Sequence, residues 1–364
     1  MPYYFNLPVI TELTIEQQAV LNEPAAIAVS GGPGTGKSVV ALWRHIRNHD
    51  SDTRHSLLLT YTKSLELYLS SSARTINQDA GDHVNRTYHW TIHEASAEYE
   101  EIIIDEAQDV NINKYFTINR LSDMVSYSAD NNQSLYSNGT KEEDLENLFQ
   151  NPHYRLRKNF RNSKQISQFV KSMFPDYLIQ FGSQESMVPK LICSNADFTI
   201  QDKIVFDILE SFAEETHNIA ILVPFQNSVQ YWYDKIREEG YTCSKYSNHD
   251  EEIERIENIH VTTFKSSKGL EFDTVIVPFF NQFQYFIDNY DIVEKNDYYV
   301  VFTRARTNLF LIDNSALSNN RTSLDFISIP LSRNLLEVDY DYIFNNTTTN
   351  TSRQYIEEED DLPF

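Results

Sequence analysis

A chain of 364 residues is long enough for two domains, each with its own hydrophobic core. The 41% hydrophobic content argues against intrinsic disorder, and two cysteines are too few for a disulfide framework. The formal net charge of −23 argues against a simple nucleic-acid-binding protein, which usually carries a basic face. Either the acidity only aids solubility, or any nucleic-acid groove is local and its binding sensitive to salt.

The beginning of the sequence lacks the pattern of a signal peptide, and no apolar run approaches the ~20 residues of a membrane span. We therefore expect a soluble, cytoplasmic protein.

Apolar, β-rich runs alternate with helical patterns along the chain, which predicts an α/β fold with parallel sheets. In the first half these runs are 25–30, 56–61, 99–105 and 124–129. In the second half they are 219–224, 260–263, 274–278 and 308–313. We expect a first domain over 1–151, a second over 152–344, and a flexible linker with an acidic tip over 345–364.

The segment 31–38 has the pattern G-x-x-x-x-G-K-S of a phosphate-binding loop, lying between an apolar run and a helical pattern over 38–47. Small residues allow backbone N–H groups to surround phosphates at a helix N-terminus. Lys37 is expected to contact the β- and γ-phosphates, and Ser38 to bind Mg²⁺. The rest of the predicted phosphate cradle is Gly32, Pro33, Gly34, Thr35 and Gly36.

The segment 102–109 is an apolar strand that ends in two adjacent carboxylates, Asp105 and Glu106. One is expected to support the metal and the other to activate water. The spacing from the phosphate loop predicts neighbouring strands of one sheet, so nucleotide hydrolysis is the leading hypothesis.

Together these segments resemble the motifs of the UvrD/Rep-type superfamily 1 helicases, in order and over residues 13 to about 313. The matching segments are 13–17, 31–38, 60–63, 87–89, 105–109, 129–134, 156–161, 262–273 and 299–306. The resemblance implies two tandem RecA-like domains with ATP and Mg²⁺ between them.

Carried onto this sequence, the resemblance implies that Asp105 supports the metal and that Glu106 is the general base. It also implies that Gln133 senses the γ-phosphate and that Arg161 and Arg304 act as arginine fingers. The adenosine would be held by Gln17, Phe160, Gly269 and Glu271. Each of these residue assignments has a plainer alternative. Lys37 could be a solvated charge on a helix, and Glu106 a carboxylate at a strand end. Arg161 and Arg304 could be surface ion-pair partners, and Phe160 a core aromatic.

The resemblance also implies contacts to a single strand of nucleic acid, with DNA favoured over RNA, and 3′-to-5′ movement. The residues concerned are Tyr61, Thr62, Lys63, His89, Thr262 and Thr263. A packed tyrosine or a core histidine is the alternative. The intervals where relatives insert accessory subdomains are short here, and Asn138 stands where the family pattern has a stacking aromatic, so autonomous unwinding is in doubt.

The last residues, Asp360, Asp361, Leu362, Pro363 and Phe364, resemble the C-terminal tip of bacterial single-stranded-DNA-binding proteins. Such a tip docks repair and replication enzymes through its terminal aromatic and carboxylate. The alternative is a solvated acidic tail.

Three functions follow from these patterns. The first is an ATP-dependent motor on single-stranded nucleic acid, within a repair, replication or anti-phage complex. The second is an ATP-dependent switch that regulates a partner such as a nuclease. The third is an adaptor that displays the tip.

Overall fold

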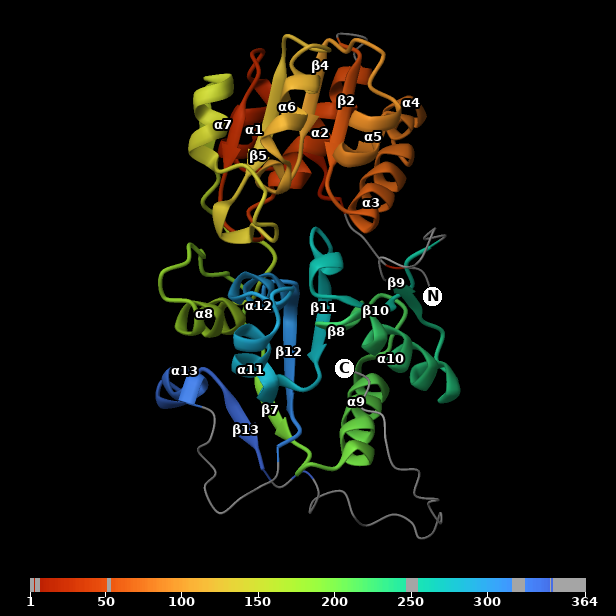
Figure 1. The fold of residues 1–364 in the computed structure, drawn as a ribbon, viewed down its shortest axis with the longest axis vertical. Coiled ribbons are helices and arrows are strands. Elements are labelled where there is room, and N and C mark those ends of the chain that lie inside the picture. Colours follow the sequence, from red (N-terminus) through yellow and green to blue (C-terminus); the bar gives the residue numbers. More distant parts are fainter. Residues whose placement is uncertain are drawn as a thin grey trace.

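The strands of the chain form two parallel sheets, one in each half of the sequence, and helices cover both faces of each sheet (Figure 1). The computed structural model describes residue 3 and residues 7–50, 54–246, 255–315, 325–340 and 342. The predicted α/β fold with two parallel sheets is confirmed. The predicted acidic tip lies outside the described residues.

The first sheet has six strands in the order β3-β2-β4-β5-β1-β6, and all of its pairings are parallel. Its strands are β1 (Ala28–Ser30), β2 (Ser56–Thr60), β3 (Val84–Arg86), β4 (Glu101–Ile104), β5 (Val125–Ala129) and β6 (His153–Arg155). β5 lies between β1 and β4, so the phosphate loop and the carboxylate segment do not follow neighbouring strands, as we had predicted from their spacing.

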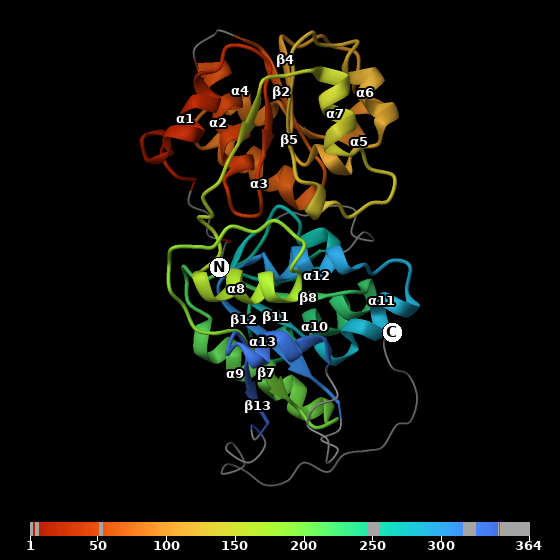
Figure 2. The same cartoon turned by 90° about the vertical axis from the view of Figure 1, so that its left-hand side faces the viewer.

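Two helical layers enclose this sheet. The helices are α1 (Ile15–Asn22), α2 (Lys37–Asp50), α3 (Lys63–Arg74), α4 (Gln78–Asp82), α5 (Thr87–His93), α6 (Ile112–Ile118) and α7 (Glu142–Phe149). Figure 2 shows α1, α2 and α4 on one side of the sheet and α5, α6 and α7 on the other. Because strands buried on both faces need apolar side chains on both, β2 and β4 read as continuous apolar runs.

The second sheet has seven strands in the order β13-β7-β12-β11-β8-β10-β9, again all parallel. They are β7 (Lys190–Cys193), β8 (Ile219–Val223), β9 (Ser244–Tyr246), β10 (Ile259–Thr263), β11 (Phe272–Val277), β12 (Ala305–Asp313) and β13 (Glu337–Asp339). β6 begins just after the expected boundary at residue 151, yet it pairs with β1. The chain therefore leaves the first sheet after Arg155.

Helices also cover both faces of the second sheet. They are α8 (Lys164–Met173), α9 (Phe198–Phe212), α10 (Gln226–Glu238), α11 (Phe283–Asn289), α12 (Lys295–Phe302) and α13 (Ser328–Ser332). One buried cluster packs α8, α11 and α12 against one face, and a second packs α9 and α10, with Trp232, against the other.

Short 3₁₀ turns lie at several strand ends. They are η1 (Ile10–Glu12), η2 (Ala107–Asp109), η3 (Asn131–Gln133), η4 (Lys265–Ser267), η5 (Phe280–Gln282) and η6 (Asp325–Ile327). Three of them, η2, η3 and η4, follow strands at the junction of the two halves and so position the site. None of the helices in the described ranges is both long and apolar enough to cross a membrane.

Candidate active site between the two sheets

A cavity of about 270 Å³ lies between the two halves of the molecule and is lined by residues from both. The predicted residues that line it are Gln17, Pro33, Gly34, Thr35, Gly36, Lys37, Ser38, Glu106, Gln133, Phe160, Arg161, Gly269, Glu271 and Arg304. Of the predicted nucleotide-site residues, only Gly32 and Asp105 are not in its lining. The tertiary structure thus brings residues far apart in the sequence to one place.

The phosphate loop connects β1 to α2, as its sequence pattern predicts. Gly34 and Gly36 have φ values of 70° and 88°, in the left-handed region that favours glycine. A Cβ at Gly34 would also lie 2.4 Å from the Asn159 side-chain oxygen, and one at Gly36 would lie 2.4 Å from Gln17. Both positions therefore require glycine, which leaves the backbone of this loop open to a bound anion.

Lys37 lines the cavity, and Asp105 precedes Glu106, which also lines it. The Lys37 ammonium donates hydrogen bonds to the carbonyls of Gly31 (2.7 Å) and Gly32 (3.3 Å). Asp105 is fully buried and accepts a hydrogen bond from the Ser128 hydroxyl, while its Oδ2 has no hydrogen-bond partner. Burial, and then the neighbouring Glu106, raise the pKa of Asp105, whereas Ser38 and Lys37 act in the opposite direction. A buried carboxylate oxygen without a partner, with a serine hydroxyl nearby, fits a hard divalent cation such as Mg²⁺.

Glu106 is held in the left-handed backbone region, with φ of 58°, two residues after the end of β4. Its carboxylate accepts a hydrogen bond from Gln108 (2.6 Å) and lies 3.2 Å from the Lys268 ammonium. Burial alone would raise the pKa of Glu106, but Lys268, Lys37 and Gln108 outweigh it and lower the pKa. Glu106 is therefore an ionised carboxylate, the form that a general base requires.

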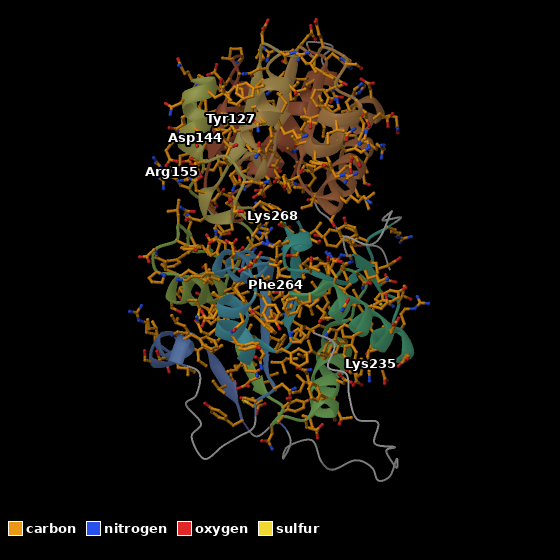
Figure 3. All side chains as sticks on the ribbon, in the orientation of Figure 1. Tyr127, Asp144, Arg155, Lys235, Phe264 and Lys268 are labelled. Carbon is orange, nitrogen blue, oxygen red and sulfur yellow. The ribbon has the colours of Figure 1, made fainter. Side chains whose placement is uncertain are left out.

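Lys268 comes from the second half of the chain and lies at the junction of the two halves (Figure 3). It is completely buried, and its ammonium contacts Glu106, Asp109 and the carbonyl of Gln133. Burial alone would lower the pKa of Lys268, but the two carboxylates raise it. We did not predict this residue as part of the site, although it lies within the matched segment 262–273.

Gln133, in η3, connects the two halves. Its side-chain amide donates to Asp130 (2.6 Å), and its side-chain oxygen accepts from Arg304 (3.1 Å). Arg304 is 1% exposed and also donates to the carbonyls of Val300 and Leu270. Burial, and then repulsion from Arg161, lower the pKa of Arg304 to about 9, so its guanidinium remains charged at neutral pH.

A second group of charges forms the outer wall of the cavity. Arg161 donates to Glu271 (2.8 Å), and Arg306 lies 3.9 Å from the same carboxylate. Burial alone would raise the pKa of Glu271, but these two arginines lower it. Phe160 is 42% exposed, and the Lys158 ammonium lies 4.8 Å from its ring. An exposed aromatic ring at the edge of a polar cavity is a suitable stacking surface for a base.

Gln17 is buried against the phosphate loop. Its amide nitrogen donates to the carbonyl of Thr35 (3.1 Å), and its side-chain oxygen accepts from the backbone N–H of Thr14 (2.9 Å). The side chain therefore caps α1 and ties that helix to the loop. Contact with an adenine stays a prediction.

The residues predicted to contact nucleic acid lie in different settings. Tyr61 packs against Tyr136, with ring centroids 4.7 Å apart, and the Lys265 ammonium lies 5.6 Å from the Tyr136 ring. Tyr136 and Lys265 were not among the predicted residues. Thr62 caps α3 and donates to the carbonyl of Lys268 (3.3 Å), and Lys63 begins α3.

The other three residues predicted to contact nucleic acid are His89, on α5, and the buried Thr262 and Thr263, on β10. His89, on α5, lies 3.1 Å from Glu94 and keeps 42% of its side chain exposed. Thr262 and Thr263 are buried at the end of β10, where their hydroxyls donate to the Tyr246 carbonyl and to Ser266. Contact of these two threonines with a strand stays a prediction and requires a change of hydrogen-bond partner.

Two family models match this chain. The model described as "Schlafen group 3, DNA/RNA helicase domain" matches residues 24–277, which is more than half of the chain. The model of the UvrD-like helicase C-terminal domain matches residues 241–316. A search of curated proteins found no match.

Several solved helicase structures are similar to this one. The C-terminal domain of a possible DNA helicase from Lactobacillus plantarum WCFS1 is 22% identical, with a TM-score of 0.37, over 49% of this chain and 98% of that one. The PRRSV helicase is 15% identical, with a TM-score of 0.44, over 85% of this chain and 56% of that one. The arterivirus nonstructural protein 10 helicase, solved with DNA, is 12% identical, with a TM-score of 0.45, over 86% and 65%. The chain thus spans less than two thirds of the length of these two viral helicases.

Proposed function

The chain belongs to the family of Schlafen group 3 DNA/RNA helicase domains, and from this premise we propose that it is a Mg²⁺-dependent ATPase stimulated by single-stranded nucleic acid. One observation carries the proposal. The phosphate loop and the carboxylates of the first half share a cavity with the buried arginine of the second half. In such an arrangement, binding of a nucleotide draws the two halves together, and the cations of one half stabilise charge that develops on phosphate held by the other.

Each residue then has a defined task. The backbone of Gly34 to Gly36 and the ammonium of Lys37 bind the phosphates. Ser38 and Asp105 hold Mg²⁺, which when bound neutralises phosphate charge and orients the γ-phosphate. Glu106 accepts the proton of the attacking water, while Arg304 and Arg161 stabilise the negative charge of the transferring phosphoryl group.

Coupling to nucleic acid would pass through Gln133. This residue touches Arg304 directly, and Lys268 donates to its backbone carbonyl (2.5 Å). Three residues further along the chain, Tyr136 contacts both Tyr61 and the Lys265 ammonium. We propose this aromatic pair with its cation as the place where a strand contacts the motor, since aromatic rings and cations bind single strands with little sequence preference.

The experiment is a steady-state ATPase assay with and without single-stranded DNA, single-stranded RNA and duplex. We expect Mg²⁺-dependent hydrolysis that rises many-fold with one of the single strands, and that Lys37→Ala or Glu106→Gln abolishes. Partial duplexes with a 3′ or a 5′ tail then test unwinding and the expected 3′-to-5′ direction. Hydrolysis that no nucleic acid alters would reject the motor.

A switch that regulates a partner is the second candidate, and the position of Lys268 favours it. The Lys268 ammonium forms an ion pair with the ionised Glu106 carboxylate, so the proposed general base is held by a contact across the two halves. ATP hydrolysis that depends on a protein partner and not on nucleic acid would support the switch. The adaptor function stays a prediction, tested by removing Leu362–Phe364 and measuring binding to proteins that recognise such tips.

A further inference from the structure

Histidines gather at the end of α2 remote from the phosphate loop. His49 lies in the last turn of α2, His55 just before β2, and His83 at the end of α4, with Asp79 on that helix. The ring centroid of His83 lies 5.3 Å from the ring centroid of His49 and 4.5 Å from that of His55. Since α2 begins at Lys37 and rises about 1.5 Å per residue, His49 lies roughly 18 Å from the phosphate loop. The cluster is therefore separate from the proposed ATPase site.

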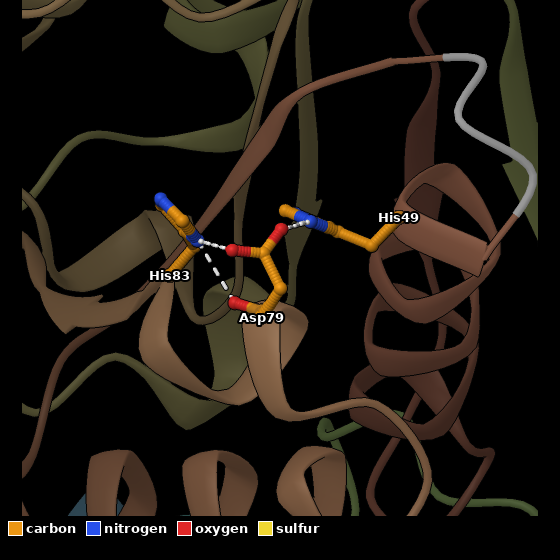
Figure 4. Close-up of side chains that lie close together, drawn as sticks. All are labelled: His49, Asp79 and His83. Carbon is orange, nitrogen blue, oxygen red and sulfur yellow. Dashed lines mark hydrogen bonds and ion pairs between the residues drawn. The ribbon is translucent and has the colours of Figure 1, made fainter.

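The Asp79 carboxylate lies between two of these rings (Figure 4). Its Oδ2 is 2.6 Å from His49 Nδ1, and its Oδ1 is 3.4 Å from His83 Nδ1. Among the residues that the structure describes, His49, Asp79 and His83 are the one group of His, Cys, Asp and Glu side chains close enough to share a metal ion. One ligand atom from each lies within 4.8 Å of the others.

The hydrogen bond on the far side of His49 fixes how this ring faces Asp79. His49 Nε2 lies 3.0 Å from the Ser56 carbonyl oxygen, which can only accept, so Nε2 carries a hydrogen. In the neutral ring, Nδ1 then turns a lone pair toward a carboxylate oxygen 2.6 Å away. A cation bound there would take this nitrogen and this carboxylate oxygen as two of its ligands.

We propose that His49, Asp79 and His83 form a binding site for a divalent transition-metal ion, with Zn²⁺ as the best-suited ion. Imidazole nitrogen and carboxylate oxygen are the ligand types that Zn²⁺ accepts, and its bond lengths of about 2.0–2.2 Å place tetrahedral ligands roughly 3.3 Å apart. The separations of 2.6 and 3.4 Å bracket that value. His83 Nδ1 also lies 2.8 Å from the Asp79 backbone carbonyl oxygen, which can only accept a hydrogen bond, so this nitrogen carries a hydrogen. Metal binding therefore requires that hydrogen to move to Nε2, which faces His55 Nε2, together with small side-chain rotations.

The surroundings also suit a metal site. His55 Nε2 lies 3.0 Å from His83 Nε2, and the Ser56 carbonyl orients His49, so each ligating ring is supported by an outer partner. The side chain of Asp79 is 64% exposed, which gives an ion access and leaves room for a water as fourth ligand. A bound ion would join α2 to α4 and the start of β3.

The test is Zn²⁺ binding by the purified full chain, measured by titration calorimetry and by metal analysis after dialysis. Asp79→Asn is the main variant, because an exposed side chain of unchanged shape should not disturb folding. His83→Ala is the second. His217→Ala is the control, since it removes an imidazole bonded to Thr274 in the other half of the molecule.

We expect one Zn²⁺ per chain in the wild type and in His217→Ala. Affinity should fall at least about 10-fold in Asp79→Asn and in His83→Ala, because even outer partners of metal ligands contribute that much. We also expect Zn²⁺ to raise the thermal unfolding midpoint of the wild type and not that of Asp79→Asn. Zn²⁺ binding that Asp79→Asn and His83→Ala leave unchanged, or no binding by the wild type, would overturn the proposal and leave a hydrogen-bonded histidine–aspartate cluster.

Discussion

Lys268 gives the sharpest test of how the two halves are joined. It is fully buried, and it is the cation that two carboxylates of the first half, Glu106 and Asp109, share. Replacing it with methionine keeps much of the side-chain volume but leaves both carboxylates buried without their cation. Breaking a buried ion pair on one side costs about 3–5 kcal/mol, so we expect Lys268→Met to lower the free energy of unfolding by that amount at pH 7.

The loss should depend on pH. In the wild type the pKa of Glu106 is lowered, so its ionised form stabilises the native state above the unfolded pKa of about 4.3, and this contribution disappears as pH falls through the native value. In the wild type, burial already raises the pKa of Asp109, although Lys268 acts in the opposite direction. In Lys268→Met, loss of the cation should raise the pKa of Glu106 and raise that of Asp109 further, so that both take up protons as pH falls. The difference between variant and wild type should therefore shrink between pH 7 and pH 4.

Urea unfolding at several pH values measures this difference. Lys203→Met is the matched control, because Lys203 pairs with Asp207 on an exposed face of α9 and such pairs contribute about 0.3–0.5 kcal/mol. A loss for Lys268→Met no larger than that of the control, or one that stays constant from pH 7 to pH 4, would refute the argument.

Three further predictions concern the cavity. Gly34→Ala should abolish nucleotide binding, measured by equilibrium binding of a labelled ATP analogue. The new Cβ would lie 2.6 Å from the Cβ of Arg161, and the φ of 70° at this position favours glycine. Binding equal to wild type would contradict the proposed role of the loop. Arg304→Ala should lower kcat by about 10³-fold or more, as for other arginine fingers, and a change confined to KM would speak against that role. Gln133→Ala should leave basal hydrolysis measurable while reducing stimulation by a single strand, and equal loss of both rates would place Gln133 in catalysis alone.

Much of the fold could be predicted from the sequence because its central strands carry strong apolar runs. β2, β5, β8 and β10 agree with the expected ranges to within a residue or two. Four of the strands that we missed, β3, β6, β9 and β13, are three residues long and lie at sheet edges, whereas β7, which we also missed, has four residues and lies between β13 and β12. An edge strand is buried on fewer sides, so its apolar pattern is weak, and only its pairing with a neighbour identifies it.

The sequence by itself determined the local geometry of the phosphate loop between β1 and α2, since the spacing of its glycines fixes the backbone conformation within a few residues. It also supplied the carboxylates after β4 and the arginine before β12. Only the tertiary structure decided that β5 separates β1 from β4, that Lys268 rather than solvent meets Glu106, and that His49 and His83 lie on either side of Asp79. Local patterns encode local conformation, whereas these contacts join segments distant in the chain and depend on how the sheets and helices pack.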